Sequence, residues 1–388
     1  MLVFAPIEGR SWRGTISVPD GDSTDAVWQT ESYIDYWPNA YHSIVNRSAS
    51  KGTRMEGRKL QLTGGSTYVV SLPKKWVIAS GLTAGDTVFL ETEADGSVSV
   101  RPRPGERPEA RKKVFEEEGD GEREHLLRKL IGAYISGFGL IEVKFKPEQG
   151  PFVRRIARDF CRMVIGPEVI EETRNAVVIQ DLSDPAELSA EKCLRRMYMT
   201  VRAMLEDALA AIRTGDEALA RDVGQRDQDV DRLYWMVAKQ YHLAHTAPPG
   251  APEGQALAGL HNHRLIAKLL ERIGDHAERI AGTFPILGEK GVDTKLMKEF
   301  ESANASAIGI LDKAFHALVS ADIDAANEAI DARISHQKLV DGLSHHVATK
   351  RGEELLALGA IADSLGRAAG YATDIAEIAI NHAIVTAP

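Results

Sequence analysis

Residues 261–282 read HNHRLIAKLLERIGDHAERIAG, and this stretch decides the fold. Its apolar residues recur every three or four positions, the period of an amphipathic helix: Ile266, Leu269, Leu270, Ile273, Ala277 and Ile280. Glu271 and Asp275 are four residues apart, so they lie about 40° from each other around the helix, opposite the apolar stripe. Two carboxylates at this spacing repel by roughly 0.2–0.5 kcal/mol. A basic side chain or a metal ion is therefore expected between them.

The same helical pattern extends to both sides of this stretch, and it repeats. Val230-Asp231-Arg232-Leu233 returns as Val340-Asp341-Gly342-Leu343, and Leu270-Glu271-Arg272 returns as Leu365-Gly366-Arg367. Short connections make consecutive helices antiparallel neighbours. The pattern therefore predicts two tandem three-helix bundles, at 189–284 and 290–384, with helices over 189–213, 216–245, 255–282, 292–320, 322–348 and 352–382.

The composition predicts a cytoplasmic globular protein of two or three domains. The chain has 388 residues, of which 44% are hydrophobic. No run approaches the ~20 apolar residues of a membrane span, and the N-terminus lacks a secretory pattern, so no membrane insertion is expected. Cys161 and Cys193 stand in no metal-binding spacing and are expected to be reduced. The net charge of −9 excludes a nucleic-acid footprint over the whole chain, although a local basic patch remains compatible with DNA.

The segment before the bundles is expected to be mixed in structure. Residues 1–54 have weak periodicity and are read either as an extension upstream of a natural start at Met55 or as a poorly ordered arm. Residues 104–123 combine proline, glycine and blocks of charge, which predicts a linker or a solvated helix extension. Residues 124–188 read as helix, strand, helix and hairpin, a short α/β connector.

Residues 55–103 show strand alternation with turns. Pro73 opens a short helix that Gly81 ends, and Asp95-Gly96 between alternating runs is a hairpin signal. A β segment of this size cannot bury enough apolar surface by itself, so it should form a homodimer.

The run LTGGSTYVVSLPKKWVIASGLTAGDTVFLETEADGSVSVRP, residues 62–102, resembles the AbrB/SpoVT-type swapped-hairpin domain. The resemblance implies that each chain supplies half of a small β-barrel and that basic residues of the dimer face double-stranded DNA. The candidates are Arg58, Lys59, Lys74, Lys75, Arg101 and Arg103. Two alternatives stay open: Lys74 and Lys75 solvate a helix start, or the module only dimerises.

The double bundle resembles the PhoU-like phosphate-uptake regulators. The resemblance lies in DQDVDRLYW (227–235) and LLERIGDHAERIAG (269–282), and more weakly in LVDGL (339–343) and YATDIAE (371–377). It implies a metal site of Asp227, Asp231, Glu271 and Asp275, in a groove at the edge of the first bundle. Hard oxygen ligands suit Fe, Mn, Mg or Ca. The same acids are equally compatible with a metal-free face, salt-bridged by Lys268, Arg272 and Arg279.

The second repeat has lost most of this pattern. Gln337, Gly366 and Gly370 stand where the first repeat has Asp227, Glu271 and Asp275, and Asp341 alone remains. We therefore expect any metal to bind only at the first bundle.

The fold class expected is mainly α, with a small N-terminal β module fused to two PhoU-like bundles, a combination that resembles archaeal phosphate regulators. It implies a transcriptional regulator of phosphate uptake that binds double-stranded DNA and contacts phosphate ABC transporter or signalling components. The alternative is an adaptor that contacts the transporter or a sensor kinase without binding DNA. The sequence contains no Ser/His/Asp or Cys/His set, dinucleotide-binding turn or Walker lysine, so no catalytic residues are proposed and an enzyme is not expected.

Overall fold

The computed structural model describes residues 58–64, 67–92, 98–102, 111–117, 122–183, 188–246, 255–288 and 290–386. Residues 1–54, and with them the alternatives for Met55, lie outside this range, as do the Asp95-Gly96 hairpin turn and Arg103. The chain divides into two compact units, Met1–Pro73 and Lys74–Pro388, each of which is described by itself.

The first unit contains one antiparallel pair of strands, β1 (Gln61–Thr63) and β2 (Thr67–Val69). Leu62 lies opposite Tyr68, and every residue of the two strands is exposed. The turn begins at Gly64, whose φ of 62° favours glycine. A pair of strands this short has no core of its own.

The second unit begins with the rest of the predicted β module, namely α2 (Lys74–Ala79), β3 (Phe89–Thr92) and β4 (Val98–Arg101). Strands β3 and β4 pair antiparallel, with Leu90 opposite Val100. The described strands of the module thus form two separate two-stranded ladders, and a closed barrel is not seen within one chain.

The predicted linker at 104–123 is wrong in its second half, because residues Lys112–Glu117 form strand β5. The sequence there is KKVFEE, in which only two apolar residues stand between charges, so the strand has almost no hydrophobic pattern. Its stability comes from parallel pairing with β6 (Leu140–Phe145), where Phe115 lies beside the buried Val143.

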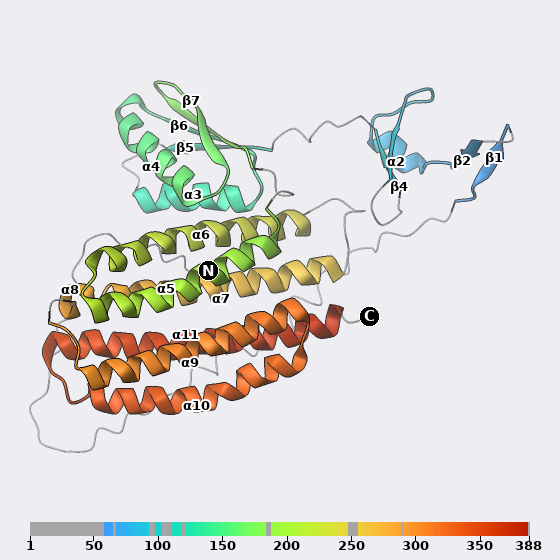
Figure 1. Ribbon diagram of the computed structural model, residues 1–388. Coiled ribbons are helices and arrows are strands. Elements are labelled where there is room, and N and C mark those ends of the chain that lie inside the picture. Colours follow the sequence, from blue (N-terminus) through green and yellow to red (C-terminus); the bar gives the residue numbers. More distant parts are fainter. Residues whose placement is uncertain are drawn as a thin grey trace, which may run out of the picture. The chain divides into compact units, whose positions relative to one another are not determined.

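The α/β connector is a four-stranded sheet, in the order β5-β6-β8-β7, with α3 and α4 against one face. Figure 1 shows α3 between the sheet and α6, and the Tyr134 hydroxyl of α3 donates to the Ile165 carbonyl at 3.0 Å. The core of this layer includes Leu130, Phe160 and Val177. The remaining elements are α3 (Arg123–Ile135), the 3-10 helix η1 (Pro147–Gln149), α4 (Gly150–Met163), β7 (Pro167–Glu172) and β8 (Ala176–Asp181).

Six long helices follow the predicted ranges closely. Four of them, α5, α6, α9 and α10, begin at a polar side chain that caps the first turn, as where Asp216 accepts from the Leu219 backbone N–H at 3.0 Å. Gly215, with φ of 70°, ends the first of them. The helices are α5 (Ala190–Thr214), α6 (Glu217–His245), α7 (Gln255–Ala281), α9 (Thr294–Ser320), α10 (Ile323–Val347) and α11 (Gly352–Thr386), with the short α8 (Phe284–Leu287) between the two sets.

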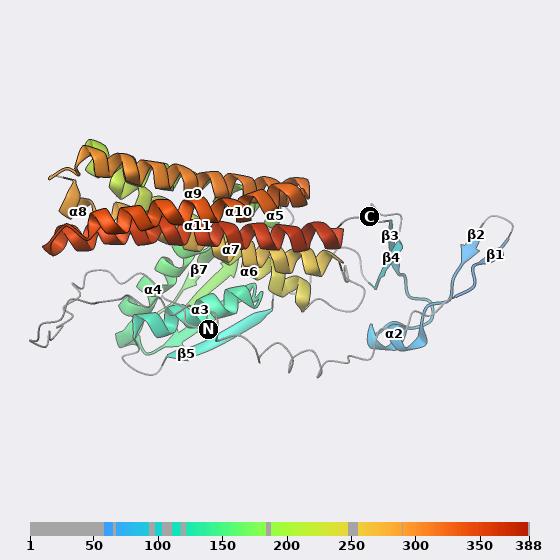
Figure 2. The same ribbon diagram turned by 90° about the horizontal axis from the view of Figure 1, so that it is seen from below.

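Helices α5, α6 and α7 form one bundle, and α9, α10 and α11 form the other. The bundles lie side by side, with α7 against α11 and α5 against α9, as Figures 1 and 2 show. One continuous core runs through both and includes Leu270 and Leu365, each fully buried. The two bundles are therefore joined into one hydrophobic unit.

Among the described residues, no helix combines the length and the apolar character that crossing a membrane requires.

Candidate metal centre between α6 and α7

The four acids predicted as metal ligands lie near one another where α6 packs against α7, along a line of contact that we call the groove. Asp227 and Asp231 come from α6, and Glu271 and Asp275 come from α7. One carboxylate oxygen each of Asp231, Glu271 and Asp275 lies within 4.8 Å of the other two. A single ion can be reached by three carboxylates at such a separation.

Asp227 completes the set from a deeper position. Its side chain is buried, with 7% of its surface exposed, and its Oδ1 has no hydrogen-bond partner within the described structure. Glu271 is also buried, at 9% exposed. The helical wheel placed the α7 acids opposite the apolar stripe, but the packing of α6 against α7 covers this side. A buried carboxylate oxygen without a partner is unfavourable, so a hydrogen-bond donor or a cation at this point would stabilise the site.

Basic side chains neutralise only the acids on the α7 side of the groove. Lys268 lies 2.6 Å from Glu271, and Arg272 lies 3.6 Å from Asp275. Arg279, which was expected to pair with these acids, instead reaches Asp363 of α11 at 2.7 Å.

In the described part of the chain, neither α6 acid has a cation within 4.0 Å. The salt-bridge interpretation thus accounts for Glu271 and Asp275 but gives Asp227 and Asp231 no ion pair among the described residues.

Burial and mutual repulsion shift the proton affinities of these groups. Burial raises the pKa of Asp227 to about 9, and the neighbouring carboxylates add to the effect. Burial and the charge of Glu271 raise the pKa of Asp231 and of Asp275 to about 7. Near neutral pH some of these carboxyl groups are therefore protonated when no cation is bound. The donor set consists of hard oxygens, which fits Fe, Mn, Mg or Ca.

The equivalent groove of the second bundle is built differently. Gln337 donates to the surviving Asp341 at 2.8 Å. A Cβ at Gly370 would lie 2.8 Å from the guanidinium of Arg333, so this side chain fills the place of the missing acid. Arg333 corresponds to Val223 in the first repeat, at the same offset of 110 residues that relates Asp341 to Asp231. The second bundle thus carries its own positive charge where the first has carboxylates.

Two residues of the first groove were missed in the sequence. Glu278 is a further acid, whose pKa burial raises and whose charge acts on Asp227. Gly274 makes room for Asp227, because a Cβ there would lie 3.0 Å from Asp227 Oδ1. Both had a signal: Glu278 follows Asp275 by three residues on the same helix face, and a glycine inside a helical pattern indicates close packing.

The basic residues predicted to face DNA belong to different units. Lys59 is exposed in the first unit, next to Arg58, and Lys74 and Lys75 are exposed in the first turn of α2 in the second. Arg101 is the last residue of β4, and Arg103 lies outside the described residues.

Comparison with known proteins identifies two parts of the chain. A model of the PhoU domain matches residues 194–283, and a model of the antidote-toxin recognition MazE family of bacterial antitoxins matches residues 61–108. A curated relative, the phosphate-specific transport system accessory protein PhoU homolog 1 of Thermotoga maritima, is 30% identical over 135 residues. That match covers 34% of this chain and 56% of the relative, so the chain spans little more than half of the relative's length.

Two solved structures are also similar, PhoU from Pseudomonas aeruginosa and the phosphate transport system regulatory protein PhoU from Streptococcus pneumoniae. They match at 21% and 17% identity with TM-scores of 0.46 and 0.44. Each covers 50% of this chain, which spans 94% and 92% of the two structures. The acid groove lies within residues 194–283, and the exposed strand pairs lie within residues 61–108. The chain therefore joins a segment similar to the MazE family to a segment similar to the PhoU domain.

Proposed function

We propose that the protein is a cytoplasmic transcriptional regulator of phosphate uptake, whose β module binds double-stranded DNA and whose bundles sense a signal. The observation that carries the proposal is the presence, in one chain, of a PhoU domain and a MazE/AbrB-like module. The relative named as a phosphate-transport accessory protein supports the phosphate link. In this proposal the bundles contact components of a phosphate ABC transporter or its signalling partners, and the protein acts as a regulator rather than an enzyme.

The exposed apolar surface of the module supports its pairing with a second copy. Leu90 of β3 is 69% exposed and Tyr68 of β2 is 67% exposed, although both stand in strands. Large apolar side chains on short strands are normally covered by packing in a soluble protein. The other large apolar side chains exposed here are Leu60, Leu62, Val69, Val70, Ile78, Phe89 and Val98. A homodimer through the module would bury them.

The lysines at the start of α2 support binding to phosphate groups. Lys74 and Lys75 stand at the positive end of the helix dipole, where basic residues cost a few tenths of a kcal/mol. Helix stability therefore does not account for them. A paired module would present each lysine twice, on a surface suited to the DNA backbone.

We further propose that the first bundle binds a divalent or trivalent cation through Asp227, Asp231, Glu271 and Asp275. The orphaned, buried Oδ1 of Asp227 supports this, because a cation in the groove would give it a partner. When bound, the ion would supply positive charge that ties α6 to α7. The ion would then alter the affinity for DNA only if the DNA-free and DNA-bound forms of the protein bind the ion with different affinities.

The DNA proposal is tested by titrating the full-length protein with a duplex from a phosphate-transporter promoter at several salt concentrations. Lys74→Ala/Lys75→Ala should weaken binding and reduce the slope of log K against log salt by about 0.9 for each DNA phosphate that the variant no longer neutralises. The matched control is Lys295→Ala/Lys298→Ala, which removes two exposed lysines from α9 and should leave both quantities unchanged.

The adaptor alternative makes the opposite prediction. There the module only dimerises, so the lysine pair would change neither DNA affinity nor its salt dependence. Genome-wide DNA occupancy with and without phosphate separates the two functions in the cell. Enrichment at transporter promoters supports the regulator, and a uniform background contradicts it.

A further inference from the structure

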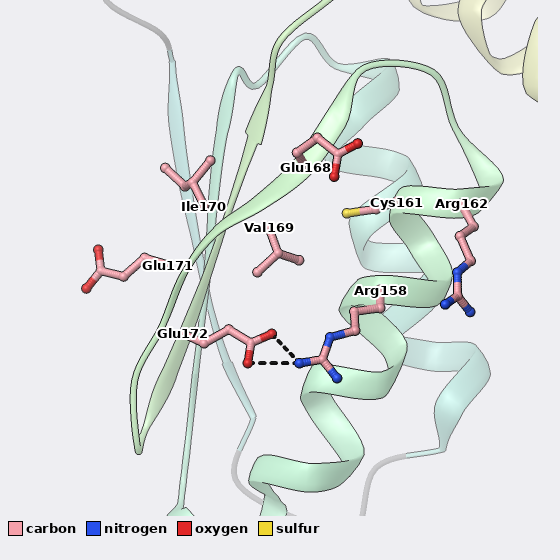
Figure 3. Close-up of a pocket in the computed structure, with 8 residues that line it drawn as sticks. All are labelled: Arg158, Cys161, Arg162, Glu168, Val169, Ile170, Glu171 and Glu172. Atoms are coloured by element: carbon pink, nitrogen blue, oxygen red, sulfur yellow. Dashed lines mark hydrogen bonds and ion pairs between the residues drawn. The ribbon is translucent and has the colours of Figure 1, made fainter.

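The sheet of the α/β connector ends in two edge strands that differ in character. Strand β7, PEVIEE, starts with a proline and has an irregular register between Val169 and Glu171. Its charged residues are all glutamates, so they repel one another. Figure 3 shows Glu172 turned toward Arg158 of α4, which it meets at 2.8 Å, while Glu171 points away from the helix. Proline, bulges and like charges are the usual means by which an edge strand avoids pairing with another chain.

Strand β5, at the other edge, has no proline and no register shift, and its charges are of both signs. It runs as KKVFEE, contains no proline, and pairs with β6 in a continuous register over all six residues. Within the described residues its outer edge has no neighbouring strand. Its first half is basic and its second half is acidic, so the strand does not repel a copy of itself that runs in the opposite direction.

The two faces of β5 have different surroundings. Phe115 packs on the connector core, and Glu117 lies 2.6 Å from Lys129 of α3, so these residues lie on the covered face. Val114 and Glu116 lie on the other face and are exposed, and Lys112 lies 2.6 Å from Glu142 of β6 there. Glu116 has no ion pair with any described residue.

Symmetry limits how two β5 strands can pair. A two-fold axis between antiparallel edge strands runs perpendicular to the sheet, so each residue faces a residue on the same face of the second copy. With Val114 on the axis, Lys112 faces Glu116 of the second copy twice, and the two Val114 side chains meet. With Lys113 or Glu116 on the axis, like charges face each other. With Phe115 on the axis, Val114 faces a carboxylate.

We propose that β5 pairs antiparallel with β5 of a second copy of this chain, with Val114 on the two-fold axis. The pairing joins two four-stranded sheets into one and uses the free N–H and C=O groups of both edges. It is a contact of the connector, separate from the proposed pairing of the β module, and it requires neither DNA nor metal.

Disulfide trapping of the full-length protein tests the pairing and its register. Directly opposed residues in an antiparallel pair have Cα atoms about 4.5–5.5 Å apart, within the range of a disulfide. Val114→Cys should therefore form a covalent dimer under mild oxidation. Glu116→Cys, two residues further along the same exposed face, should not, and neither should Ile170→Cys, which is 50% exposed on the guarded strand β7. The parent chain, with Cys161 and Cys193, sets the baseline.

Charge reversal in the Val114→Cys background tests the complementarity. Lys112→Glu or Glu116→Lys turns both cross-strand ion pairs into repulsive pairs and should slow cross-linking about tenfold. The double reversal restores opposite charges between the copies and should recover most of the rate, with a melting curve confirming that each variant is folded. Equal cross-linking at the three cysteine positions, or a double variant no faster than the single ones, would overturn the proposal.

Discussion

The two bundles share the same arrangement of helices, but equivalent grooves in them carry opposite charges. Leu270 of the first and Leu365 of the second are both fully buried in one continuous core. In the first groove the described cations pair only with the acids of α7, whereas the second groove places Arg333 beside Gly370. A repeat can therefore keep its packing while an arginine of its own chain takes the place of an acid.

The largest effect is expected where the bundles are alike. Leu270→Ala and Leu365→Ala should each lower the free energy of unfolding by about 2–5 kcal/mol, because each opens a cavity in the core. Since this core is shared, both variants should unfold in one transition, measured by circular dichroism and by calorimetry. Separate transitions for the two bundles would contradict the single hydrophobic unit.

A smaller effect is expected from pH in the metal-free protein, where the bundles differ. The pKa of Asp227 is raised from 3.8 to about 9 in the folded state, so its contribution to stability is fully present below pH 3.8 and is lost as pH rises toward 9. Asp227→Asn stays neutral and should be more stable than the parent near pH 9, on the order of 2 kcal/mol or more, with little difference below pH 4.

Denaturant unfolding of chelator-treated protein across this pH range measures the difference. Asp341→Asn, the equivalent change in the second bundle, is the control and should leave the pH profile of the parent in place. A parent protein whose stability rose with pH up to 9 would contradict the crowded-acid description of the first groove.

Introducing the residues of the first groove at the equivalent positions of the second tests the comparison further. The variant Arg333→Val/Gln337→Asp/Gly366→Glu/Gly370→Asp removes the built-in cation and restores the acids. It should bind more manganese per chain than the parent, as measured by isothermal titration calorimetry. The same acids without Arg333→Val are the control, and they should bind more weakly because the guanidinium still occupies the site.

The smallest effect is expected at Gly274. In Gly274→Ala the new Cβ would lie 3.0 Å from Asp227 Oδ1, so the carboxylate must shift by a few tenths of an ångström. Stability should change by less than about 1 kcal/mol, since the higher helix propensity of alanine offsets the crowding of the carboxylate. Metal affinity should fall about tenfold, because ligand geometry sets it. Gly366→Ala, in the second repeat, has room and should not affect metal binding.

Most of the fold could be predicted from sequence because the bundle helices have a three-to-four-residue apolar period and four of the six begin at polar caps such as Asp216. The four acids were predicted because Asp227/Asp231 and Glu271/Asp275 stand at helical spacing in the two runs that resemble PhoU-like proteins. Their burial could not be predicted, since it depends on α6 approaching α7 at Gly274, a tertiary contact. Strand β5 was missed for a similar reason: KKVFEE becomes a strand by pairing with β6, which its own composition does not indicate.

The most direct test of the asymmetry between the bundles is the metal content of the full-length protein, purified, reloaded with manganese and dialysed. The parent should retain manganese in proportion to protein, Asp227→Asn/Asp275→Asn should lose it, and Asp341→Asn should retain it. Equal trace manganese in all three proteins would contradict the account, and the acids of the first groove would then be satisfied by protons and by Lys268 and Arg272.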